Sequence, residues 1–211
     1  MDRVADSFAY PFRRGGARRV WLIGIPLVVL LPLGVVPLLG YAVAVVRSAA
    51  TDPQAGPPPW RPLPPLLADG LLVALVILVL TAPFAFFTWA LAPSAGLLFA
   101  GVGDPFLRSG LGLVIAAAVA ALPWGILLLV LMPPATARFA SSRRYRDLLD
   151  APAAIRTVRR RFPAWNLAVV AIVTAWAIGL SGLGLALVGV VPGILYAMLV
   201  SAHATASLAD A

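Results

Sequence analysis

The chain has 211 residues, of which 62% are hydrophobic and only 11% are charged. A soluble domain of this size would be far more polar, so the composition predicts an all-α fold, a polytopic transmembrane helical bundle in one integral membrane domain over residues 1–211. The absence of cysteine excludes disulfides, thiolate nucleophiles and cysteine-ligated metals. A net charge of +8 could suggest a nucleic-acid partner, but the arginines gather at the ends of apolar runs, which favours lipid instead.

Residues 1–19 are predicted to be a cytoplasmic N-terminal segment. Its aromatic rings stand beside arginines, a combination that suits the headgroup level of a bilayer. For residues 1–7, an unstructured basic tail is an alternative.

The following run, residues 20–46, is apolar but contains Pro26, Pro32 and Pro37. It could cross the bilayer once as a tilted helix, or bend near Pro32 into a proline-broken hydrophobic hairpin.

Two clear membrane spans follow a proline-rich loop at residues 47–69. They are predicted over residues 70–91 and 110–132, each long enough for a hydrocarbon core of about 30 Å. Thr81, inside the first span, is expected to bond to a backbone carbonyl or to a neighbouring helix. Asp104 and Arg108 lie in the loop between the spans, and their spacing predicts a local, solvated ion pair.

Residues 164–206 are too long for one crossing and are predicted to form a helical hairpin that reverses at residues 181–184. Several glycines in this hairpin are expected to be close-packing or hinge positions. They are Gly179, Gly182, Gly184, Gly189 and Gly193.

Residues 133–163 form a basic loop that holds half of the sixteen basic residues of the chain. Within it, residues 151–162 show the apolar spacing of an amphipathic helix, with Asp150 as its N-cap. Such a helix would lie flat on the cytoplasmic membrane surface. The candidate site for lipid headgroups is the arginine set on its polar face, Arg156, Arg159, Arg160 and Arg161.

The arginines also decide the predicted topology, because cytoplasmic loops carry the excess of basic residues. A single crossing by residues 20–46 from a cytoplasmic N-terminus would place the eight-arginine loop outside. A hairpin places it inside, so the hairpin is favoured. We therefore expect a multi-pass protein of the cell membrane with cytoplasmic N- and C-termini, and with only the loop around Asp104 outside.

A short internal repeat supports a plan of two hairpins. Gly34-Val35-Val36-Pro37-Leu38-Leu39-Gly40-Tyr41-Ala42 matches Gly189-Val190-Val191-Pro192-Gly193-Ile194-Leu195-Tyr196-Ala197. Each copy follows an arginine-rich segment and an apolar limb. Chance in a biased composition is the rival explanation, but duplication is favoured because matched repeats are common in membrane folds.

Short segments along nearly the whole chain resemble the integral membrane family catalogued as domain of unknown function 4013. The resemblance implies a multi-span helical bundle with cytoplasmic amphipathic segments, and it implies no activity. The loop at residues 47–69 departs from the family in having prolines where acidic residues are common. The similar segments are Phe8-Ala9-Tyr10-Pro11-Phe12-Arg13, Gly40-Tyr41 followed by Arg47, Trp60 leading to Ala68-Asp69-Gly70, Pro133-Pro134-Ala135 with Ala137-Arg138-Phe139, residues 154–161, and Leu195-Tyr196 with Ala202-His203.

No catalytic, cofactor-binding or metal-binding residues can be assigned from the sequence, and we expect the protein not to be an enzyme. The chain has one histidine and no glutamate or lysine. His203 is expected to bond locally near the end of its helix, with Asp69 as the one carboxylate that could pair with it. The predicted function is a non-catalytic membrane module that packs with lipid or partner proteins. The alternative is a small transporter or channel component built from a duplicated hairpin.

Overall fold

The computed structural model of the chain describes residues 2–13, 17–60, 62–185 and 189–209. Every regular element in these ranges is helical, which confirms the predicted all-α class. Four helical segments, formed by α3, α4, α5 and α8, are long and apolar enough to cross a membrane. The elements in chain order are α1 (Asp2–Ala9), η1 (Tyr10–Phe12), α2 (Ala17–Val29), α3 (Leu31–Thr51), α4 (Leu63–Gly96), η2 (Leu97–Phe99), α5 (Pro105–Ser142), α6 (Arg146–Leu149), α7 (Ala151–Arg160), α8 (Phe162–Ser181), η3 (Gly182–Leu185) and α9 (Val190–Ala206).

The chain divides into two compact units. The first comprises Met1–Ala74 and Leu131–Ala211, and the second comprises Leu75–Val130. The first unit therefore contains the start of α4 and the end of α5 together with all the other α-helices. The second unit contains the rest of the α4–α5 hairpin.

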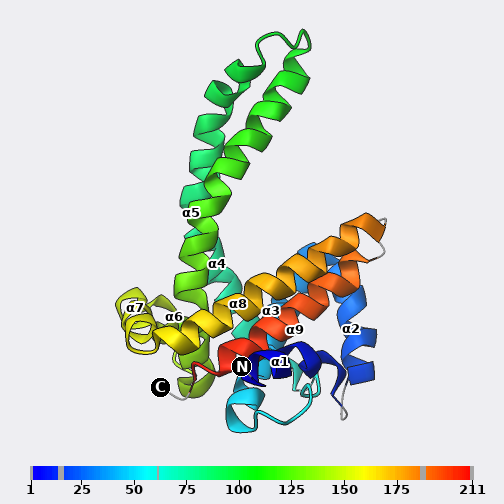
Figure 1. The fold of residues 1–211 in the computed structure, drawn as a ribbon, viewed down its shortest axis with the longest axis vertical. Helices are drawn as coiled ribbons and strands as arrows, with labels where there is room; N and C mark the ends of the chain where they lie inside the picture. Colours follow the sequence, from blue (N-terminus) through cyan, green and yellow to red (C-terminus); the bar gives the residue numbers. More distant parts are fainter. Residues whose placement is uncertain (1, 14–16, 61, 186–188, 210–211) are drawn as a thin grey trace. The chain divides into compact units, whose positions relative to one another are not determined.

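Helix α9 is the centre of the first unit. It contacts α8, α3 and α2, and its C-terminal half also meets the N-terminal elements α1 and η1 (Figure 1). Leu195, Leu199 and Val200 are consequently fully buried. Because α9 is apolar on all sides, it suits a position that is surrounded by other helices.

Helices α8 and α9 lie side by side and approach closely through glycines. A Cβ atom on Gly179 would run into the backbone of Gly193, and one on Gly182 would run into Gly189. Likewise, a Cβ atom on Gly193 would run into Gly179, and one on Gly189 would run into Gly182. Four of the five glycines that we expected at close contacts are therefore at close contacts between helices. Gly184 is different, since a Cβ atom on it would meet nothing within 4 Å.

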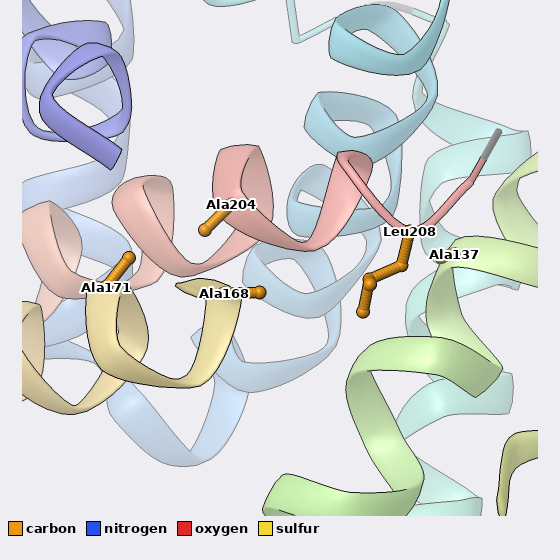
Figure 2. Packing of buried hydrophobic residues seen from close by; sticks show 5 residues of the cluster. All are labelled: Ala137, Ala168, Ala171, Ala204 and Leu208. Carbon is orange, nitrogen blue, oxygen red and sulfur yellow. The ribbon is translucent and has the colours of Figure 1, made fainter. Parts of the chain in front are cut away.

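Small side chains continue this close packing at the other end of the α8–α9 pair. Figure 2 shows alanines of α5, α8 and α9 gathered with one leucine that follows α9. Small residues let helix backbones approach, which increases van der Waals contact where no hydrophobic effect drives association. The buried cluster consists of Ala137, Ala168, Ala171, Ala204 and Leu208.

The apolar run at residues 20–46 is broken into α2 and α3 at Leu30, whose backbone leaves the helical region at φ −87° and ψ 40°. Pro32 lies in the first turn of α3, a position where proline is tolerated because its missing N–H would be unpaired anyway. The two helices contact each other. With 13 residues, α2 is about 20 Å long, which is too short for a hydrocarbon core of about 30 Å.

The two copies of the internal repeat occupy equivalent places just after these reversals. A Cβ atom on Gly34 would meet the carbonyl group of Leu27, and one on Gly189 would meet that of Gly182. In both copies the facing residue is the one seven positions earlier. This shared contact agrees with the duplication favoured from the sequence.

The likeness between the copies extends further than the short repeat. The hydroxyl group of Tyr41 donates to the carbonyl oxygen of Pro58 at 2.7 Å, and that of Tyr196 donates to Phe8 at 3.3 Å. At the same spacing before the two glycines, Trp21-Leu22-Ile23-Gly24 matches Trp176-Ala177-Ile178-Gly179. The sequence match supports duplication of a helix–break–helix segment, whereas the two tyrosines donate to partners that are not equivalent in the repeat.

The second unit is a pair of helices with few internal polar contacts. The indole nitrogen of Trp124 in α5 donates to the hydroxyl oxygen of Thr81 in α4 at 3.1 Å. Thr81 therefore bonds to a neighbouring helix, as expected from the sequence. At the other end of the pair, Gly112 lies against the carbonyl of Ala92 and against Gly96. Most other side chains of this unit are exposed leucines, valines and aromatic residues, which is typical of helices that face lipid.

Candidate membrane-surface site and buried polar cluster

Arg138, near the end of α5, organises the basic segment that follows it. Its Nη2 atom lies 2.8 Å from a carboxylate oxygen of Asp147 and 3.5 Å from one of Asp150. The hydroxyl group of Ser142 also donates to Asp147. Both acidic residues of the segment are thus held by Arg138, and the arginines around them leave a net positive charge.

The amphipathic helix predicted from the sequence is α7. Asp150 caps it, since its carboxylate accepts a hydrogen bond from the backbone N–H of Ala153 at 2.9 Å. That hydrogen bond, and then the charges of Arg138 and Arg156, hold the pKa of Asp150 below its usual value. The cap was predicted correctly. The helix was predicted to extend to residue 162, but α7 ends at Arg160, and Phe162 begins α8 with Pro163 in its first turn.

The arginines proposed as the headgroup site lie in the last two turns of α7 and just beyond it. Arg156, Arg159 and Arg160 are exposed, whereas Arg161 is half-buried at the junction with α8. Arg161 is therefore less available to a headgroup than the other three.

The apolar face of α7 is only partly covered by protein. Ala154 is fully buried, but Ile155 is 46% exposed and Phe162 is 55% exposed. In and beside α6, Tyr145 and Leu149 are also exposed. Four large apolar side chains are thus exposed to solvent beside exposed arginines. This combination is typical of helices that lie in the interface of a membrane.

A second polar group, not predicted from the sequence, surrounds His203 in the last turn of α9. The Nδ1 atom lies 2.9 Å from the hydroxyl oxygen of Ser7, and the Nε2 atom lies 3.3 Å from the carbonyl oxygen of Pro53. A carbonyl can only accept, so Nε2 carries the proton and Nδ1 accepts the proton of Ser7. The ring of Tyr10 packs on the imidazole, with 4.4 Å between the centroids.

Charged groups surround this cluster on its outer side. Arg13 forms an ion pair with Asp6 at 3.1 Å and donates to the same carbonyl oxygen of Pro53 at 2.6 Å. Burial lowers the pKa of His203, while its bond to Pro53 opposes the shift. The imidazole is therefore neutral at physiological pH and ties together α1, α9 and the loop after α3.

A cavity of about 110 Å³ adjoins this cluster, lined by Ser7, His203 and Asp6 on one side and mostly by alanines of α8 and α9 on the other. The carbonyl oxygen of Pro53 orients the imidazole through Nε2, the place that a carboxylate takes in a Ser-His-Asp triad. Among the described residues, no group of three or more histidine, aspartate or glutamate side chains could hold a metal ion.

The local bond expected for His203 and the ion pair expected between Asp104 and Arg108 are not formed. His203 bonds to residues far away in the chain rather than locally, and Asp69 pairs with Arg47 at 3.1 Å instead of with His203. Asp104 and Arg108 form no side-chain ion pair. Instead, Asp104 caps α5 by accepting from the backbone N–H of Phe106 at 2.8 Å. No sequence signal pointed to Ser7 or Pro53, since both bonds depend on tertiary packing.

Comparison with known protein families gives a match over most of the chain. The family described as Protein of unknown function (DUF4013) matches residues 23–190, which include α3 to α8 and most of α2. The searches of curated proteins and of solved structures each found no match.

Proposed function

Since the chain belongs to the DUF4013 family, whose function is unknown, we propose that it is a non-catalytic module of the cell membrane. Its helices insert from the cytoplasmic side, and its α6–α7 segment binds anionic lipid headgroups. The observation that carries this proposal is the exposure of Ile155 and Phe162 beside Arg156, Arg159 and Arg160. A basic amphipathic surface of this kind binds by burying apolar area and by attraction to anionic lipid.

The charge arrangement supports anionic rather than neutral lipid. Residues 133–163 carry eight arginines against Asp147 and Asp150, and both carboxylates pair with Arg138, which lies outside α7. Each arginine near an anionic surface contributes about 1 kcal/mol to binding. Three exposed arginines on α7 therefore provide an attraction that salt should weaken.

The positions of the polar pairs favour a membrane module over a transporter. A transporter core needs polar groups at mid-depth, where the substrate binds. In the first unit, Arg47 and His203 lie in or near the last turn of α3 and α9, and Asp69 lies in the second turn of α4. Polar groups at helix ends stabilise the contacts between elements at the membrane edge.

The test uses the cysteine-free chain in lipid nanodiscs. A single cysteine in place of Ile155 carries an environment-sensitive fluorophore, and the label at Gln54→Cys, an exposed loop position, is the control. We expect a blue shift at position 155 in phosphatidylglycerol relative to phosphatidylcholine, with no change at position 54. Replacing Arg156, Arg159 and Arg160 by glutamine should remove the shift. Equal emission in the two lipids would contradict the proposal.

A further inference from the structure

A second cavity of the first unit lies where the C-terminal ends of α3 and α5 meet. It has a volume of about 350 Å³, within the range of small-molecule sites, and its charged lining residues are Arg47 and Arg143. Three alanines, Ala50, Ala140 and Ala209, form much of the remaining wall. Their short side chains leave room beside the two guanidinium groups.

Arg47 is held in place from one side. Its Nε atom donates to the carbonyl oxygen of Ala140 at 3.0 Å, and its Nη2 atom donates to Asp69 at 3.1 Å. The side chain is 29% exposed, so it is neither enclosed nor free to swing into solvent. A guanidinium fixed in this way is preorganised to receive a further anionic partner, because little rotamer freedom is lost on binding.

Arg143 is in an unfavourable backbone conformation. Its φ angle is 58°, in the left-handed region, and its N–H donates to the carbonyl oxygen of Phe139 at 2.9 Å to close the end of α5. Glycine and asparagine are the residues that suit this position. An arginine here costs conformational energy, and backbone strain of this kind often accompanies functional residues. The strain therefore points to a role for the side chain.

Counted over residues 2–13, 17–60, 62–185 and 189–209, the charges around the cavity leave it positive. Asp69 neutralises one of the two arginines, while Asp147 and Asp150 are held by Arg138. Guanidinium groups bind phosphate oxygens through two parallel hydrogen bonds, which makes arginine the usual partner of a phosphate group.

From these observations we propose that the cavity binds the phosphate of an anionic lipid headgroup. Arg47 and Arg143 contact the phosphate oxygens, and the lipid chains extend into the bilayer. The proposal rests on the proposed function, because Arg143 can reach a headgroup only if the segment leading to α6 lies at the membrane surface. The cavity would thus provide a specific phosphate site in addition to the nonspecific electrostatic attraction between α7 and anionic lipid.

The test compares two neighbouring exposed arginines in the full-length protein in detergent. Thermal unfolding is followed with short-chain phosphatidic acid, with short-chain phosphatidylcholine and with inorganic phosphate. We expect phosphatidic acid alone to raise the melting temperature of the wild-type protein. Arg143→Gly should melt at a higher temperature than wild type without lipid, since the strain is relieved, yet bind phosphatidic acid about tenfold more weakly. Arg144→Gly, which removes an exposed arginine outside the cavity, should retain wild-type affinity.

Each contrary result has a separate meaning. Equal weakening in the Arg143 and Arg144 variants would overturn the site, since it would show diffuse attraction. Equal stabilisation by inorganic phosphate would overturn its assignment to lipid. If the label at position 155 does not respond to phosphatidylglycerol but Arg143→Gly still weakens phosphatidic acid binding, the site stands and the proposed function fails. If the label responds and Arg143→Gly binds normally, the site fails alone.

Discussion

At the scale of single residues, His203 should make the stability of the protein depend on pH. Burial lowers its pKa in the folded state, so the unfolded chain takes up the proton more readily. The stabilisation is complete above the unfolded pKa of about 6.5 and is lost as the pH falls through the folded value. We expect the melting temperature to fall between about pH 7.5 and pH 5.5, where aspartates remain ionised.

The control for this prediction is simple because the chain has one histidine. His203→Gln keeps an amide that can donate and accept but cannot titrate in this range. Its melting temperature should be nearly constant over the same pH interval. Asp6 and Arg13 face the imidazole with opposite charges, so their effects on the pKa of His203 oppose each other. A variant with the pH dependence of the wild type would show that another group is responsible.

Gly40 should be among the positions least tolerant of a methyl group. A Cβ atom there would run into the carbonyl of Leu66 and the nitrogen of Gly70, both in the backbone of α4. Backbone cannot move aside as a flexible side chain can, so we expect Gly40→Ala to destabilise the protein by about 1–3 kcal/mol. Gly101→Ala is the matched control, since a Cβ atom there meets nothing within 4 Å. Similar melting temperatures for the two variants would contradict this account.

The site residues that could be predicted were those whose role is visible in the neighbouring sequence. Asp150 was recognised as a cap because a helix start has a signature over a few neighbouring residues. The contact between Ser7 and His203 has no such signature, since it joins residues at opposite ends of the chain. Arg143 was predicted as one of several basic loop residues, but its left-handed backbone and its cavity emerge only in three dimensions.

At the scale of elements, α7 should depend on its cap. Asp150→Ala removes the hydrogen bond to Ala153 and one of the two carboxylates around Arg138. Loss of a cap costs about 1 kcal/mol of helix stability. We expect faster amide hydrogen exchange over residues 151–160 and little change in α8. Asp52→Ala provides the control, because Asp52 makes a comparable bond to the N–H of Gln54 outside any helix. Unchanged exchange in Asp150→Ala would refute the prediction.

Proline explains why some helix boundaries differ from those expected. The proline-rich loop was predicted to continue to residue 69, but α4 begins at Leu63 and has Pro64 and Pro65 in its first turn. Proline is unfavourable inside a helix yet suits its first turn, where no backbone donor is needed. Similarly, α4 continues through Pro83 and Pro93. Proline content alone therefore did not separate loop from helix.

At the scale of the whole molecule, the topology can be tested with single cysteines. Intact cells are treated with a membrane-impermeant maleimide after introducing cysteine at exposed positions, namely Ala5, Gln54, Ser94 and Ser142. Ala5 is used near the N-terminus because Ser7 is buried against His203. We expect only Ser94→Cys to react, because the arginine-rich segments should all be cytoplasmic.

Two other labelling patterns would have distinct consequences. Reaction at Ser142→Cys without reaction at Ser94→Cys would overturn the entire orientation. Reaction at Ala5→Cys together with Ser94→Cys would show that α2 and α3 cross the bilayer as one segment. The 13 residues of α2 argue against that result, since a break at Leu30 leaves too little helix on one side.

The central position of α9 also determines the order in which the protein can assemble. During synthesis, α9 leaves the ribosome after all the other helices described here. Helices α4 and α5 are consecutive, so their hairpin can form while translation continues. By contrast, the faces of α2, α3 and α8 that pack on α9 remain unpartnered until α9 has been synthesised. The first unit can therefore complete its core only after α9, the last of the described helices, has been synthesised.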